Sequence, residues 1–287
     1  GKTCLLKSIF DNTGVLWIDL LQFKEESYFI EDPDRLSALL EVNKAKIDWV
    51  VIDEVQKIPK LLDVVHREIE HGKTKFALTG SSARKLKRGS ANLLAGRAFV
   101  YNLFPLTVQE LGSRFNLAEI LQFGSLPKIF DFESTEEKTL FLESYVETYL
   151  KEEIFAEQLT RNIVPFRKFL GVAAKCNGTI INFNKIATEL HIDDKTARTY
   201  FEILEDTLLG FFLLANEKSY RKQVIKSPKF YLFDCGVKRA IEGLGRLPIE
   251  SSQEAGPAFE HYIISEIFRL NHYNRKNYQM SYLRTKS

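Results

Sequence analysis

The tripeptide Gly-Lys-Thr occurs twice in the sequence, at residues 1–3 and 72–74, and both copies carry residue types that bind phosphate. Backbone N–H groups at a helix start and a lysine ammonium attract phosphate oxygens. Such a site needs a strand, a turn and then a helix. A helical apolar spacing follows the first copy, whereas the second follows a helix-like segment and precedes a strand-like one. The first copy is therefore the candidate, and Gly72 is expected to be a helix C-cap.

Two adjacent carboxylates, Asp53 and Glu54, follow the apolar run 49–52, which is typical of a parallel strand buried on both faces. Ligands of open α/β sheets gather at the carboxyl ends of strands. In P-loop NTPases an aspartate there helps to hold Mg²⁺ together with the Ser/Thr of the phosphate loop. An adjacent carboxylate can orient and deprotonate the attacking water. The alternative is a pair of solvated carboxylates, one of which caps the next helix.

A third polar segment follows the strand-like run 75–78 and begins with Thr79, Gly80, Ser81 and Ser82. A small hydroxyl residue on a strand beside the acidic one can sense the γ-phosphate or position water. The alternative is a Gly-Ser turn that caps the next helix. Five basic residues come next: Arg84, Lys85, Lys87, Arg88 and Arg97. Such a run is usually a solvated face, although an arginine can also stabilise charge on a transferring phosphoryl group.

Alternating strand-like and helix-like segments must position these residues. Strand-like runs lie at 14–23, 47–54 and 75–82, and helix-like runs lie at 33–42 and 59–72. Repeated βα units of this kind predict an α/β fold with a parallel sheet flanked by helices. After about residue 105 the pattern becomes mainly helical, which predicts a second region of different architecture.

Length and composition set wider limits. A chain of 287 residues with 45% hydrophobic and 27% charged residues predicts about two globular domains. The net charge of +2 gives no global case for nucleic acid or membrane binding. Three widely spaced cysteines and five histidines without metal-ligand spacing argue against disulfides and zinc, and fit the cytoplasm. No apolar run approaches the ~20 residues of a membrane span. Because the chain starts at glycine, we expect it to be clipped at the front.

Residues 177–216 form a helix-turn-helix-like block. Either Asp193 or Asp194 is expected to cap its second helix. In a DNA-binding version the N-terminal residues of that helix would meet base edges, and these are Lys195, Thr196, Arg198 and Thr199. Acidic residues farther along the helix would repel phosphates. DNA binding and a helix pair that contacts only protein therefore both stay open.

Several long segments resemble the bacterial and archaeal predicted AAA-type ATPases with a C-terminal domain of unknown function. They include “VVIDEVQKIPKLLDVVH”, “FALTGSSARKLKRGSANLLAGRAFVYNLFPLTVQEL”, “GSLP” and “GPAFEHYIISEIFRL”, and the resemblance covers nearly the whole chain. It implies that Lys2 contacts the β- and γ-phosphates, with Gly1, Thr3 and Cys4 beside it. Thr3 and Asp53 would serve Mg²⁺, Glu54 would be the catalytic base, and Ser81 a sensor-like residue. Arg97 would be an arginine finger or a structural residue.

The same resemblance implies a domain order. An AAA-type core at 1–110 that lacks the start of its P-loop would precede a helical subdomain at 111–165 and a winged helix at 166–228. The start of an α+β, restriction-endonuclease-like domain would follow at 229–287, where Glu260 and Glu266 lie on the corresponding helix. Nuclease activity is not predicted, because the other metal-binding positions would fall after residue 287.

The sequence thus predicts a cytoplasmic ATP hydrolase that uses ATP and Mg²⁺, is coupled to a winged-helix module, and can form homo-oligomers. The alternatives are a DNA-binding regulator or a protein-interaction module in which the nucleotide fold does not hydrolyse ATP.

Overall fold

The computed structural model describes residues 1–10, 14–43, 46–72, 74–80, 97–149, 163–216, 226–249 and 253–283. The chain divides into two compact units, residues 1–103 and residues 104–287. Each unit has hydrophobic clusters of its own.

The first unit is built on a parallel three-stranded sheet with strand order β1-β2-β3. The strands are β1 (Val15–Asp19), β2 (Trp49–Asp53) and β3 (Lys75–Leu78). The helices are α1 (Lys2–Ile9), α2 (Phe23–Glu31), α3 (Arg35–Val42) and α4 (Leu61–His71), and a short 3₁₀ turn, η1 (Val55–Lys57), follows β2. The predicted α/β fold with a parallel sheet is confirmed.

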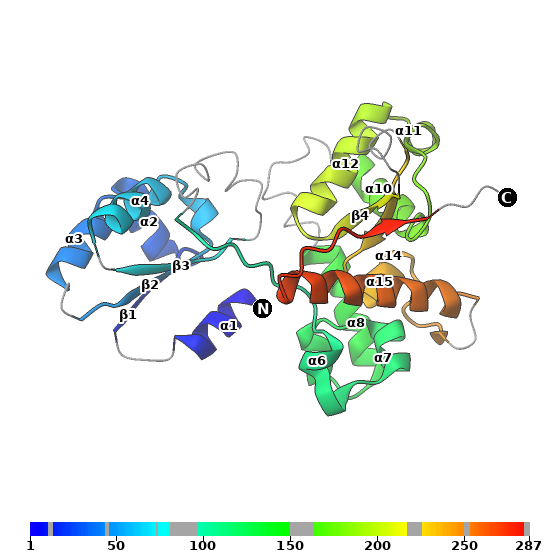
Figure 1. Ribbon diagram of the computed structural model, residues 1–287, viewed down its shortest axis with the longest axis horizontal. Coiled ribbons are helices and arrows are strands. Elements are labelled where there is room, and N and C mark those ends of the chain that lie inside the picture. The colour runs from blue at the N-terminus through cyan, green and yellow to red at the C-terminus, as the bar shows by residue number, and fades with distance from the viewer. Residues whose placement is uncertain are drawn as a thin grey trace. The chain divides into compact units, whose positions relative to one another are not determined.

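Side chains of β2 alternate between the two faces of this sheet. Val50 and Ile52, both fully buried, belong to the hydrophobic cluster that α2, α3 and α4 complete on one face. Helix α1 lies on the opposite side (Figure 1), where the ring of Phe10 just after it packs on Trp49 with centroids 4.9 Å apart. Because both faces are covered, β2 needs the unbroken apolar run that the sequence shows.

The strand expected at residues 14–23 is shorter than predicted, since β1 ends at Asp19 and α2 begins at Phe23. The Asp19 carboxylate accepts hydrogen bonds from the backbone N–H of Leu21 (3.0 Å) and from the side chain of Gln22 (3.3 Å). An aspartate that binds the backbone two residues ahead makes a turn in place of a strand. The prediction failed because the apolar run continues through this turn.

The second Gly-Lys-Thr copy begins where α4 ends and leads toward β3, as the sequence predicts. Gly72 is the C-cap, but its backbone is extended rather than left-handed. Its N–H donates to the carbonyl oxygen of Glu68 at 2.8 Å, and a Cβ on Gly72 would lie 2.7 Å from that oxygen. Close approach of the backbone therefore explains the glycine.

The second unit combines helices with a small mixed sheet of strand order β5-β4-β6. Its strands are β4 (Gly210–Ala215), β5 (Lys229–Leu232), antiparallel to β4, and β6 (Ser281–Tyr282), parallel to β4. Its α-helices are α6 (Val108–Leu111), α7 (Leu117–Phe123), α8 (Thr135–Ser144), α10 (Ile163–Lys175), α11 (Phe183–Leu190), α12 (Asp194–Asp206), α14 (Cys235–Ile241) and α15 (Ala255–Tyr273). Two 3₁₀ turns, η2 (Gly112–Arg114) and η3 (Pro127–Asp131), and a π-helical turn, η4 (Tyr145–Tyr149), complete it.

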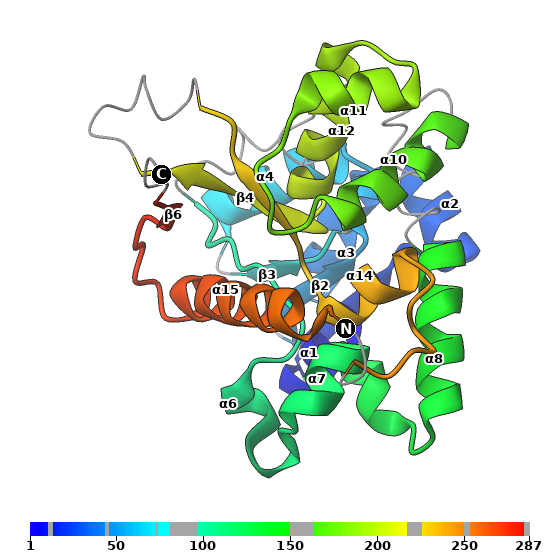
Figure 2. The same ribbon diagram turned by 90° about the vertical axis from the view of Figure 1, so that its right-hand side faces the viewer.

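Helices α10, α11 and α12 lie on one side of the small sheet and α15 on the other (Figures 1 and 2). Phe201 of α12 is fully buried at the centre of the first side, with its ring 4.8 Å from that of Phe169 and 4.9 Å from that of Phe230. On the second side the rings of Phe211 and Phe268 stack 3.9 Å apart. Aromatic packing therefore joins α10, α12 and α15 to the sheet.

Among the described residues, no helix has the length and apolar character that crossing a membrane requires.

Candidate nucleotide site

Helix α1 and the carboxyl end of β2 meet through Thr3 and Asp53. The Thr3 hydroxyl donates a hydrogen bond of 2.7 Å to Oδ2 of Asp53, a residue that is 1% exposed. Next to it, the Lys2 ammonium donates to the carbonyl oxygen of Gly80, just after β3, at 2.6 Å. The two predicted phosphate-loop side chains thus lie at the strand ends where the sequence placed the acidic pair.

Thr79 occupies the centre of this cluster. Its hydroxyl donates to Oδ1 of Asp53 and accepts a 3.1 Å hydrogen bond from the backbone N–H of Glu54. Both carboxylate oxygens of Asp53 therefore have threonine partners, one from α1 and one from the end of β3. The predicted sensor-like residue at this strand end was Ser81, which lies outside the described residues. The hydroxyl that the structure shows at this strand end is that of Thr79, and the role of Ser81 stays a prediction.

Glu54 adopts a left-handed backbone conformation, with φ +59° and ψ +44°. This conformation is uncommon for a residue with a side chain and is concentrated at functional sites. The carboxylate of Glu54 accepts a hydrogen bond from the side-chain amide of Gln56. Gln56 lies within the segment “VVIDEVQKIPKLLDVVH” that carries the family resemblance, but no role was predicted for it.

Gly1 and Cys4 lie at the start of α1. Gly1 is the N-cap residue, its carbonyl oxygen accepts from the N–H of Leu5 at 3.0 Å, and Cys4 is solvent-exposed. The first turn of α1 is therefore formed as the strand–turn–helix pattern requires.

Arg97 lies elsewhere in the first unit. Its guanidinium forms an ion pair of 2.8 Å with Glu70 near the end of α4. Among the described residues, the structure gives Arg97 no contact with Asp53 or Glu54.

The donor set fits Mg²⁺ with a bound nucleotide. Mg²⁺ prefers hard oxygen ligands and commonly takes one or two protein groups together with substrate phosphates. The Thr3 hydroxyl and the Asp53 carboxylate are oxygen ligands already in contact, and the Lys2 ammonium beside them is suited to phosphate. Within the described ranges no group of three or more His, Cys, Asp or Glu side chains could hold a metal by itself.

The four predicted DNA contacts lie on the first turns of α12. Asp193 is the N-cap, one of the two expected residues, and the N–H and hydroxyl of Thr196 donate to it. These hydrogen bonds, first that of the hydroxyl, lower the pKa of Asp193. The Arg198 guanidinium lies over the ring of Phe183, 4.1 Å from its centroid. Lys195 is exposed and Thr199 is partly buried.

A buried charged centre holds the second unit together. The Asp234 carboxylate is fully buried and accepts from the backbone N–H groups of Ser125 (2.8 Å) and Val237 (3.0 Å). Burial raises the pKa of Asp234, although the nearby Arg269 opposes the shift. The Arg269 guanidinium donates to the Ser125 hydroxyl at 2.9 Å and to the carbonyl of Phe233 at 2.6 Å. Because the carboxylate of Asp234 and the guanidinium of Arg269 both have hydrogen-bond partners within the second unit, we assign this centre a structural role.

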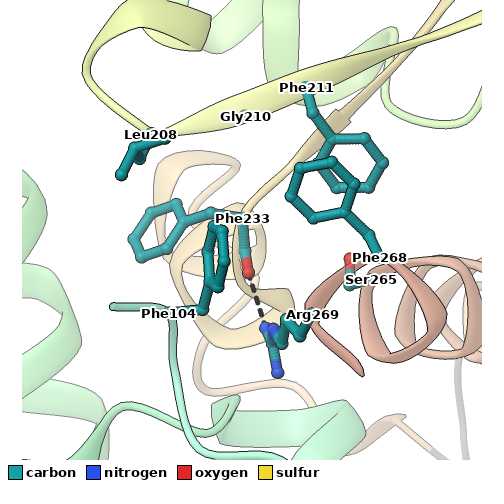
Figure 3. Close-up of a pocket in the computed structure, with 8 residues that line it drawn as sticks. All are labelled: Phe104, Leu208, Gly210, Phe211, Phe233, Ser265, Phe268 and Arg269. Atoms are coloured by element: carbon teal, nitrogen blue, oxygen red, sulfur yellow. Dashed lines mark hydrogen bonds between the residues drawn. The ribbon is translucent and has the colours of Figure 1, made fainter. Parts of the chain in front are cut away.

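A small pocket adjoins this centre between β4 and α15 (Figure 3). Phenylalanine rings line most of it, and the guanidinium of Arg269 is engaged with the carbonyl of Phe233. Ser265 also lines the pocket, and its buried hydroxyl has no hydrogen-bond partner among the described residues.

The two glutamates on the helix that the resemblance links to nucleases also have partners. Glu260 accepts from Tyr231 at 2.7 Å and from Lys229 at 3.1 Å. Glu266 accepts from the N–H of Val108 at 2.8 Å. Their contacts lie on different elements.

Comparisons with known proteins divide the chain at a similar place. Residues 1–112 match the family model described as an AAA domain, and residues 114–247 match a domain of unknown function (DUF8612). Uncharacterized proteins of Mycobacterium bovis (Mb2031c) and Mycobacterium tuberculosis (Rv2008c) are each 27% identical over 225 residues, which cover 77% of this chain and 51% of each relative. An uncharacterized protein of Methanocaldococcus jannaschii (MJ1544) is 24% identical over 316 residues, covering 99% of this chain and 69% of the relative.

The chain thus spans about half the length of the two mycobacterial relatives. No solved structure matches it. The parallel sheet and the family matches together show that the chain has an AAA-type P-loop domain at its N-terminus, followed by a domain of unknown function.

Proposed function

We propose that the protein binds ATP with Mg²⁺ through Lys2, Thr3 and Asp53, and hydrolyses it with Glu54 as the general base. The observation that carries this proposal is the hydrogen bond between Thr3 and Asp53, which joins the start of α1 to the end of β2. Two residues fifty positions apart are brought together in the arrangement that holds Mg²⁺ in P-loop NTPases.

Each residue then has a definite task. The Lys2 ammonium leaves the carbonyl of Gly80 and pairs with phosphate oxygens. Thr3 and Asp53 would hold Mg²⁺, which when bound offsets negative charge on the phosphates. Glu54 accepts a proton from the attacking water while the water oxygen bonds to the γ-phosphorus. The bond between that phosphorus and the bridging oxygen breaks, and ADP leaves.

We further propose that α10, α11, α12 and the hairpin of β4 and β5 form a winged-helix module. Support comes from their order along the chain, from Asp193 as the cap of the second helix, and from the antiparallel bridge between Ile180 and Lys229, which adds a third strand position. The boundaries 166–228 for this module and 229–287 for the following segment stay predictions, as does homo-oligomerisation. Strand β5, which pairs with β4, lies just past the boundary at 228, so the module proposed here ends later, at Leu232.

Two substitutions test the ATPase proposal. Lys2→Ala should abolish binding of a fluorescent ATP analogue, whereas Glu54→Gln should keep that binding and lose ATP turnover, because the base is removed but the phosphate contacts are not. Lys73→Ala is the matched control, since it changes the lysine of the other Gly-Lys-Thr and should leave both quantities unchanged. Full turnover by Glu54→Gln would refute the assignment of the base.

A further inference from the structure

The backbone around Glu54 fixes the direction in which its side chain leaves the chain. The N–H of Glu54 donates to the Thr79 hydroxyl at 3.1 Å, and its carbonyl oxygen accepts from the N–H of Lys57 at 3.0 Å. The N–H of Val55 donates to the carbonyl of Thr79 at 2.9 Å. A left-handed conformation is unfavourable for a residue with a side chain, so these bonds hold Glu54 in a conformation that it would rarely adopt alone.

The side chain of Glu54 has a partner of its own on the 3₁₀ turn η1. Gln56 is 8% exposed, and its amide N–H donates to Oε2 of Glu54. A hydrogen bond from a neutral donor to an ionised acceptor is stronger than one between neutral groups. The buried side-chain amide of Gln56, two residues along this turn, therefore binds the carboxylate of Glu54, where the turn begins.

We propose that Gln56 is the positioning residue for the general base in ATP hydrolysis. This inference rests on the proposed function and adds a residue to it. A base that removes a proton from water must keep one oxygen directed at that water. Gln56 binds the other oxygen, Oε2, and so restricts rotation of the carboxylate. In this role it acts through Glu54.

The test is Gln56→Met, which keeps the side-chain volume and removes the donor. Because small errors of placement cost up to about 100-fold in rate, we expect kcat for MgATP to fall roughly 10- to 100-fold. KM for MgATP and the Kd of a fluorescent ATP analogue should stay within about twofold of wild type. The midpoint of thermal unfolding should change little, since the site remains packed.

A matched control separates positioning from general stability. Gln122 is also 8% exposed, and its amide donates to the carbonyls of Gly245 and Leu247 in the second unit. Gln122→Met should lower the unfolding midpoint and leave kcat unchanged. The exchange Glu54→Gln with Gln56→Glu keeps an amide facing a carboxylate, so stability and nucleotide binding should stay at wild-type levels while turnover is lost.

The outcomes are distinct. Wild-type kcat in Gln56→Met, or a parallel loss of kcat, nucleotide binding and stability, would overturn the positioning role and leave the proposed ATPase intact. Wild-type turnover in Glu54→Gln would overturn the proposed base and its positioning residue together. A protein that binds MgATP without hydrolysing it would overturn both proposals.

Discussion

Within each of the two units, a single buried polar side chain links separate parts of the chain by hydrogen bonds. In the first unit one hydroxyl, that of Thr79, joins the side chain of Asp53 to the backbone of Glu54. In the second unit the imidazole of His261, 1% exposed, lies between the carbonyl of Leu232 (2.6 Å) and the thiol of Cys235 (3.5 Å). Buried polar groups need such partners, because an unpaired one costs about 1–3 kcal/mol.

His261 gives the second unit a pH dependence. Burial lowers the pKa of His261 to about 4, with smaller effects from Arg269, Lys238 and Glu260 and from its bond to Leu232. In the unfolded chain its pKa is about 6.5. The unfolded state therefore binds more protons between pH 4 and 6.5, so the His261 contribution rises with pH across this window and is lost as the pH falls.

The variant His261→Gln should remove that slope. We expect the difference in unfolding free energy between wild type and variant to change by about 2.4 kcal/mol from pH 4.5 to 7 in urea titrations. Burial raises the pKa of Asp234, which gives a slope of opposite sign, but Asp234 is present in both proteins and cancels in the difference. Parallel profiles for the two proteins would show that His261 does not titrate as argued.

At the scale of elements, helices α7 and α14 meet through two glycines. Gly124 has φ +74°, and a Cβ there would lie 1.9 Å from Oδ1 of Asp234. A Cβ on Gly236 would lie 2.1 Å from the carbonyl oxygen of Phe123. The buried carboxylate can cap α14 and bind the N–H of Ser125 only because neither residue has a side chain.

Gly124→Ala should therefore be strongly destabilising. It combines the cost of a backbone conformation that glycine alone adopts readily (φ +74°, ψ −164°), roughly 1–3 kcal/mol, with a clash against a buried carboxylate, and we expect a total above about 4 kcal/mol. Gly243 is the matched control, because it has φ +72° with nothing within 4 Å of its Cβ position. Gly243→Ala should lower the free energy of unfolding, measured by urea titration, only by the conformational cost. Equal losses for the two variants would contradict the steric argument.

The sequence predicts elements best where one face must be buried or a cap must form. The apolar run 49–52 correctly places Asp53 at a strand end, and Asp193 is one of two predicted caps. Residue-level contacts across the sheet are harder, because Thr79 and Ser81 are equivalent until the strand register is known. The side chain of Gln56 reaches Glu54 only because Glu54 is left-handed, and no periodicity encodes that conformation.

At the scale of the whole molecule, the surface charge of helices α11 and α12 indicates whether they bind DNA or protein. The exposed side chains of α11, its turn and α12 include five acidic and three basic residues: Glu189, Asp193, Asp194, Glu202 and Glu205 against Lys185, Lys195 and Arg198. Affinity for duplex DNA comes largely from cations that replace counterions on phosphates. Arg198 lies over Phe183 and close to Asp194, at 3.8 Å, so part of that small positive charge is already paired.

We therefore expect this helix pair to bind duplex DNA no more tightly than about 10⁻⁴ M at physiological salt, the weak end of non-specific binding. The measurement is fluorescence anisotropy of a labelled duplex over a salt series, with the protein carrying Lys195→Glu and Arg198→Glu as the comparison. This pair of changes should alter affinity by less than about twofold, because Lys195 and the partly paired Arg198 together release few counterions. The reverse variant, Asp194→Lys with Glu202→Lys, should bind DNA more tightly and with a steeper salt dependence, which shows that the assay detects charge on this surface.

Submicromolar binding by wild type that falls steeply with salt and is lost in the Lys195 and Arg198 variant would instead establish α12 as a DNA-reading helix. Weak binding in both would favour a protein partner for the helix pair, since the acidic excess that repels phosphates attracts basic protein surfaces.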